Sequence, residues 1–155
     1  MKITVELLSE HGACAPRKAA FAVRFPDGAT AEEAVAWASL EDLQWVCEYV
    51  PSLSERAWEA ILAHADLDLY SLRYVCYYVP SLRERAGEAL IARADPDLYS
   101  LRHVCATVPS LRERAWAALR SRADLDLDSL RYVCYYAPSL SERAGAEAKR
   151  RGWVI

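Results

Sequence analysis

Four cysteines recur at a fixed spacing of 29 residues, and the sequence around them recurs with them. They are Cys47, Cys76, Cys105 and Cys134. Two neighbouring copies run DLYSLRYVCYYVPSLRERAGEALIARADP and DLYSLRHVCATVPSLRERAWAALRSRADL. A fixed period of this size is typical of tandem repeats, in which each supersecondary unit buries its apolar face against the next.

Each copy carries the signals of two helices. In the copy that begins at Asp68, apolar residues such as Leu72 and Cys76 recur with helical spacing. Asp68 is the expected N-cap of the first helix, and Pro80 is expected to end it. The motif Ser-Leu-x-Glu follows in every copy and predicts a capping box at the start of the second helix. The four serines of this motif are Ser52, Ser81, Ser110 and Ser139.

The sequence therefore predicts an all-α fold, an α-solenoid of four 29-residue αα-hairpins. Residues 1–38 break the period and are expected to form a three-helix N-terminal cap, its last helix opened by a capping box of Thr30 and Glu33. Residues 39–155 form the predicted solenoid. Its four repeats are 39–67, 68–96, 97–125 and 126–155.

Composition excludes several classes of protein. Apolar residues make up 54% of the chain and charged residues 26%, a composition typical of globular proteins. No apolar run approaches the roughly 20 residues that span a bilayer. Glu6 and Glu10 interrupt the first residues, so no signal peptide is expected there. The expected location is cytoplasmic, without membrane association.

The repeated cysteine is predicted to be a small core residue. Equivalent residues of adjacent hairpins should lie roughly 8–10 Å apart. That separation exceeds the roughly 7 Å limit between Cα atoms for a disulfide and is too long for a shared metal ion. We expect no metal and no cofactor, and Cys14 is assigned to the core in the same way.

The sequence offers little to support catalysis. His11, His64 and His103 are distant from one another in the chain, and the chain lacks a phosphate-binding loop and a nucleophile elbow. We therefore expect that the protein is not an enzyme.

Aromatic and arginine side chains recur on the face of the first helix that lies opposite its core stripe. Tyrosine, tryptophan and arginine dominate binding hot spots, so this face is the candidate partner-binding site. A second core layer of packed rings is the alternative interpretation. The candidate residues are Trp45, Tyr70, Arg73, Tyr74, Tyr99, Arg102, His103, Arg131 and Tyr132.

Two further positions alternate along the repeats. The first position carries either tryptophan or glycine, and in the second copy it is Gly87. The second position is Tyr77 in that same copy. Because the tyrosine occurs where the glycine opens space, we expect these two positions to share one volume in the core.

Three functions suit this pattern. The favoured one is a non-catalytic scaffold that binds a protein partner through the aromatic and arginine face. The first alternative is head-to-tail self-assembly into a homo-oligomer. Residues 1–67 are net acidic, with 5 basic and 11 acidic side chains, and residues 68–155 are net basic, with 14 and 11, so opposite ends of two chains would attract. The second alternative, nucleic-acid binding by ring stacking, is less favoured because the chain is net acidic.

The repeats resemble the HEAT-like α-solenoids. The resemblance covers residues 39–155 and depends on an aspartate in the loop between hairpins and an arginine early in each second helix. The aspartates are Asp66, Asp95 and Asp124, and the arginines are Arg56, Arg85, Arg114 and Arg143. The opening segment, with Gly12-Ala13-Cys14, Phe21 and Phe25-Pro26-Asp27-Gly28, is similar to openings of uncharacterised bacterial and phage proteins. The solenoid resemblance implies macromolecular recognition.

Overall fold

The computed structural model describes residues 2–154; Met1 and Ile155, which belong to the predicted cap and last repeat, lie outside this range. The described chain is mostly helical, which confirms the all-α prediction. None of its helices is long and apolar enough to cross a membrane. Contacts between residues divide the chain into an N-terminal unit, Met1–Leu67, and a C-terminal unit, Asp68–Ile155. The first hairpin therefore belongs with the N-terminal segment in its contacts.

The N-terminal unit begins with three helices and a small sheet. The helices are α1 (Val5–Glu10), α2 (Ala15–Arg24) and α3 (Ala31–Trp37), close to the three that the sequence predicts. Strands β1 (Lys2–Ile3) and β2 (Ala29–Thr30) pair antiparallel, and the sequence did not predict them because two residues show no alternation.

Gly28 makes this pairing possible. Its φ is +79°, a left-handed conformation that favours glycine, and a Cβ there would lie 2.7 Å from the carbonyl oxygen of Ile3. The predicted capping box of α3 is confirmed, since the Thr30 hydroxyl accepts from the Glu33 amide at 3.2 Å and the Glu33 carboxylate accepts from the Thr30 amide at 2.8 Å.

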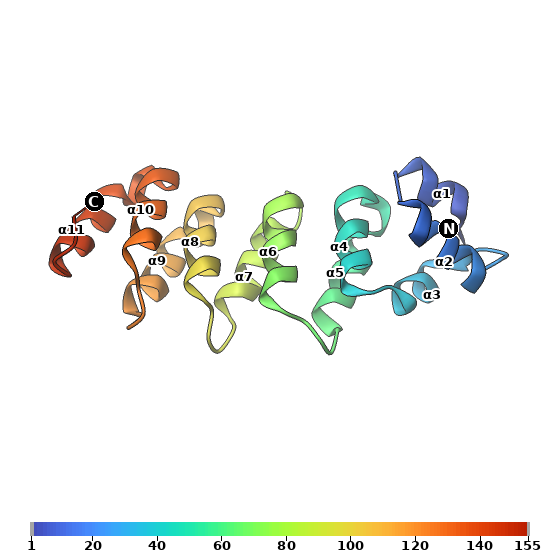
Figure 1. Cartoon of the computed structure of the whole chain (residues 1–155), viewed down its shortest axis with the longest axis horizontal. Helices are drawn as coiled ribbons and strands as arrows, with labels where there is room; N and C mark the ends of the chain where they lie inside the picture. Colours follow the sequence, from blue (N-terminus) through green and yellow to red (C-terminus); the bar gives the residue numbers. More distant parts are fainter. Residues whose placement is uncertain (1, 155) are drawn as a thin grey trace. The chain divides into compact units, whose positions relative to one another are not determined.

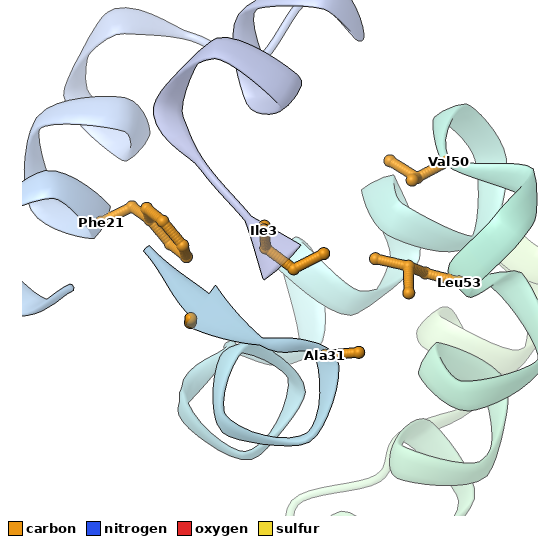
Figure 2. Close-up of a cluster of buried hydrophobic side chains, with 6 residues drawn as sticks. Ile3, Phe21, Ala31, Val50 and Leu53 are labelled. Carbon is orange, nitrogen blue, oxygen red and sulfur yellow. The ribbon is translucent and has the colours of Figure 1, made fainter. Parts of the chain in front are cut away.

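A hairpin completes the N-terminal unit: α4 (Leu40–Tyr49), the 3-10 turn η1 (Pro51–Leu53) and α5 (Ser54–Ala63). Figure 2 shows Ile3 pointing towards Leu53 of this hairpin, with Phe21 on the opposite side of Ile3, and Val50 belongs to the same cluster. These apolar side chains bury their surface together, and this burial is the main force that holds the short helices in place.

The C-terminal unit is built from three hairpins, and in Figure 1 their first helices, α6, α8 and α10, lie side by side. The first hairpin consists of α6 (Leu69–Tyr78) and α7 (Arg83–Ile91). The second consists of α8 (Leu98–Thr107), η2 (Pro109–Leu111) and α9 (Arg112–Ser121). The third consists of α10 (Leu127–Tyr136), η3 (Pro138–Leu140) and α11 (Ser141–Arg150).

The first helix of every hairpin begins and ends where the sequence predicts. Asp97 Oδ1 accepts a hydrogen bond from the Ser100 amide at 2.6 Å, and its counterparts Ser39, Asp68 and Asp126 cap their helices in the same way. Helix α6 ends at Tyr78, so that Val79 before Pro80 leaves the helical conformation.

The capping boxes predicted for the second helices are wrong. Helices α5, α7, α9 and α11 each follow a leucine that makes no side-chain cap. In three hairpins the proline opens a 3-10 turn that runs straight into the α-helix, so the serine lies inside this turn and not in an extended N-cap conformation.

The first residue of the second helix, directly after this leucine, links the two helices of its hairpin by a hydrogen bond instead. Ser54 Oγ donates to the Cys47 carbonyl at 3.0 Å, and Arg83 Nε donates to the Cys76 carbonyl at the same distance. Each bond satisfies a carbonyl near the end of a first helix, which has no partner within the helix.

The repeated cysteines are core residues, as predicted. Cys47, Cys76 and Cys105 are buried, Cys134 is less so, and all four are free thiols. Burial raises the pKa of the Cys47 and Cys105 thiols to about 12. The same assignment is wrong for Cys14, which is exposed at the N-cap position of α2.

The predicted pairing of Gly87 with Tyr77 is also wrong. Gly87 is buried between hairpins, where a Cβ would lie 2.9 Å from Leu111 Cδ1 and 3.2 Å from Val108 Cγ2. Tyr77 is 53% exposed. The glycine opens space for the leucine of the next hairpin, so the alternation with tyrosine does not reflect a shared volume.

Candidate functional site: an aromatic face on the C-terminal unit

Helices α6, α8 and α10 present a continuous surface of rings and guanidinium groups, which we call the aromatic face. Its members are Tyr70, Arg73, Tyr74, Tyr77, Tyr78, Tyr99, Arg102, His103 and Tyr132. All but Arg102 line a hollow of about 490 Å³. A concave surface of this size with both rings and polar groups is suited to binding.

Two arginines fix the rings in place. The guanidinium carbon of Arg102 lies 4.6 Å from the Tyr99 ring centroid and 4.9 Å from that of Tyr132. Arg73 lies 4.9 Å from the Tyr99 ring. These distances are those of cation–π contacts, which hold the rings in place.

Arg73 is itself held in place. Its Nη1 donates to Asp97 Oδ2 at 2.8 Å and to Ser100 Oγ at 3.3 Å, so the N-cap of α8 also anchors an arginine of α6. Asp97 therefore links the start of one helix to the aromatic face of its neighbour. Partial burial favours a higher pKa for the Asp97 carboxyl, but hydrogen bonds with Ser100 and the nearby positive charge of Arg73 together outweigh it, so this pKa is lowered.

His103 forms the floor of the aromatic face. It is only 5% exposed, its ring centroid is 5.2 Å from that of Tyr77, and no described residue hydrogen-bonds its Nε2. Burial, followed by the positive charges of Arg73, Arg83 and Arg102, lowers the pKa of His103 to about 4. The imidazole is therefore neutral at pH 7 and packs as an uncharged ring.

The tyrosines form two layers. Tyr74 and Tyr132 are half-buried against the helices, whereas Tyr70 is 60% exposed and Tyr99 is 53% exposed. The inner layer resembles the second core layer considered from the sequence, and the outer layer leaves flat rings open to solvent. The aromatic face thus combines a packed base with accessible rings.

The candidate residues predicted from the sequence do not include Tyr78 and Tyr136, which lie one helical turn after Tyr74 and Tyr132. The Tyr74 and Tyr78 rings lie 4.7 Å apart, and those of Tyr132 and Tyr136 lie 4.5 Å apart. The signal was present, since residues four apart on a helix are neighbours. Tyr77, which the sequence predicts to lie in the core, also lines the hollow.

Two of the predicted residues are not among the residues of this cluster. Arg131 is exposed on α10, 3.7 Å from the Asp128 carboxylate. Trp45 belongs to the N-terminal unit, where its ring stacks on Tyr49 at 5.8 Å. There it lines a separate apolar hollow of about 280 Å³, to which Leu7 and Phe21 also contribute.

Among residues 2–154, no group of three His, Cys, Asp or Glu side chains is arranged to hold a metal ion. The chemistry that the aromatic face offers is stacking on rings, donation from hydroxyl and guanidinium groups, and burial of apolar surface. Comparisons with protein-family models, with curated proteins and with solved structures find no match to this chain.

Proposed function

We propose that the protein is a non-catalytic binding scaffold that holds a protein partner on the aromatic face. The observation that carries this proposal is the arrangement of Tyr99, which remains 53% exposed while Arg73 and Arg102 both contact its ring. An exposed ring held by fixed neighbours loses little freedom when a partner covers it, so more of the burial energy contributes to affinity.

The scaffold itself is proposed to be a short α-solenoid. Helix α8 packs against both α6 and α10, and Gly87 of α7 receives Leu111 from the following hairpin. Ion pairs between successive second helices support the same arrangement: Arg114 contacts Glu88 at 2.6 Å and Arg143 contacts Glu113 at 2.7 Å. The free cysteines suit a reducing, cytoplasmic location.

A protein partner fits this surface better than a nucleic acid does. Arg73 is paired with Asp97, and Arg131 lies near Asp128. Pairing with carboxylates lowers the positive charge that phosphate groups would meet. The rings therefore contribute more to recognition than net charge does.

The proposal is tested by selecting binders from a random peptide library displayed on phage, using the whole chain as bait. We expect selected peptides to lose at least about tenfold in affinity for a Tyr70→Ala, Tyr99→Ala double variant. Both side chains are exposed, so the circular dichroism spectrum and melting temperature should change little.

Arg120→Ala provides the matched control, because Arg120 is exposed on α9 and lies outside the aromatic face. Selected peptides should bind this variant as they bind the wild type. Peptides that bind the double variant with unchanged affinity would contradict the proposed site.

A further inference from the structure

We infer that the segment recognised by the aromatic face is an extended, proline-rich segment in the polyproline II conformation, with an acidic residue among the prolines. The inference depends on the proposed function and adds the chemical class of the partner. Three independent properties of the face support it: the spacing of its rings, its hydrogen-bonding groups and its uncompensated charge.

The rings of the aromatic face lie close enough for one turn of a polyproline II helix to span two of them. Tyr99 on α8 and Tyr132 on α10 contact the same guanidinium carbon of Arg102, at 4.6 and 4.9 Å, so their centroids can be no further apart than these distances added together. Packed helices are roughly 8–10 Å apart. Polyproline II completes a turn in three residues, roughly 9.3 Å. Each first helix can therefore receive one turn of the ligand.

The phenol and guanidinium groups of the face can all donate hydrogen bonds. Tyr70, Tyr77 and Tyr99 are exposed and carry phenol hydroxyls, and the arginines carry N–H groups. A proline-rich segment has few N–H groups but keeps all its carbonyl oxygens, which are solvated and available to accept. Helical ligands satisfy their carbonyls internally, so they match this surface less well. Proline rings also pack against flat aromatic surfaces.

Charge indicates the acidic residue. Residues 68–155 carry 14 basic and 11 acidic side chains. Arg73 already has Asp97, but no described carboxylate pairs with Arg102, and its Nε is buried without a hydrogen-bond partner. A glutamate or aspartate beside the prolines would complement this half-buried guanidinium group.

The experiment measures binding of a fluorescent peptide to the full chain by fluorescence polarisation. The probe has about twelve residues, enough for three to four turns, with proline at two of every three positions and one central glutamate. The reference peptide replaces every proline by alanine and keeps the glutamate and the length. We expect the proline probe to bind at least about tenfold more tightly, since the alanine peptide must lose more conformational freedom and cannot pack proline rings on tyrosine.

Variants locate the contact. Tyr99→Ala should weaken binding of the proline probe by about tenfold or more, and Tyr99→Phe, which keeps the ring and loses the hydroxyl, by a smaller factor. Arg120→Ala should leave it unchanged. Replacing the probe's glutamate by glutamine should weaken binding to the wild type several-fold at low salt.

Equal binding of the proline and alanine probes would overturn the inference, as would binding of the proline probe that ignores Tyr99→Ala. If the phage selection described above yields ligands that need Tyr99 but contain no proline, the inference fails while the proposed function stands. If oligothymidylate displaces the probe and binds more tightly as salt falls, the partner is a single-stranded nucleic acid and the inference again fails. A selection that yields no ligand for the aromatic face would remove the proposed function itself.

Discussion

Gly87 and Gly145 occupy the same position in their repeats but have different surroundings. A Cβ at Gly87 would lie 2.9 Å from Leu111 Cδ1, whereas a Cβ at Gly145 would meet no atom within 4 Å. We expect Gly145→Ala to raise the free energy of unfolding by about 0.5–1 kcal/mol, because alanine favours the helix. Gly87→Trp should lower it by about 1–3 kcal/mol through overpacking. Urea denaturation measures both changes.

The alanine variants provide the control for this pair. Gly87→Ala gains the same helix propensity as Gly145→Ala, but its methyl group must displace the buried Leu111 side chain. Gly87→Ala should therefore be less stable than Gly145→Ala. Equal stabilisation by the two would show that the space beside Gly87 is not filled.

His103 should make stability depend on pH. Its pKa is about 4 in the folded chain, against about 6.5 when unfolded. As the pH falls through 6.5 the unfolded chain binds a proton that the folded chain does not, so stability is complete above pH 6.5 and is lost as the pH falls towards 4. The free energy of unfolding should fall by at most about 3 kcal/mol through this effect. Denaturation midpoints measured between pH 7.5 and 4.5 give this slope.

The variant His103→Tyr isolates this effect, since tyrosine occupies the equivalent position at Tyr74 and Tyr132. Tyrosine does not titrate in this range, so the pH slope should become shallower whatever the absolute stability of the variant is. An unchanged slope would assign the pH dependence to other groups.

At the scale of the helix, capping connects the repeat to the aromatic face. Asp97 caps α8 and also holds Arg73 at 2.8 Å. We expect Asp97→Ala to lower the free energy of unfolding by about 1–2 kcal/mol, most of it from the lost cap. Asp126→Ala, which removes the cap of α10, should cost about 1 kcal/mol. Chemical denaturation of the two variants provides the comparison.

Asp97→Asn separates the two roles of this residue. Asparagine caps helices as well as aspartate does, so α8 should keep its start while the charge that orients Arg73 is lost. This variant should retain nearly all stability, because partly exposed ion pairs contribute little. A loss as large as that of Asp97→Ala would mean that the ion pair, and not the cap, is the main contribution.

The first helices could be predicted because their signals are local. Asp68 and Pro80 define both ends of α6 through their own backbone preferences, whatever packs around them. The start of the second helix depends on the conformation that the preceding proline imposes, so Ser52 had the right identity for a cap but lies in a 3-10 turn. The pairing of β1 with β2 depends on contacts across more than 25 residues, which no local pattern records.

At the scale of the whole molecule, repetition predicts which residues share a face but not how far each is covered. Tyr74, His103 and Tyr132 occupy one repeat position, yet His103 is buried and the two tyrosines are half-buried. The difference arises from neighbours: Tyr77 of the preceding hairpin lies against the His103 ring. The exposure of a side chain therefore depends on neighbours from two hairpins at once. The shared pattern of the repeats does not record these neighbours.

The division of contacts into two units predicts how the chain unfolds. Cys47 is buried in the N-terminal unit and Cys76 and Cys105 in the C-terminal unit, while Cys14 is exposed. A buried thiol reacts only when its surroundings open, and cooperative opening follows clusters of contacts. With short pulses of N-ethylmaleimide at increasing urea, read by mass spectrometry, we expect Cys14 to be labelled without urea. Cys76 and Cys105 should share one midpoint and Cys47 should have another. A single midpoint for all three buried thiols would show that residues 1–155 unfold as one cooperative unit.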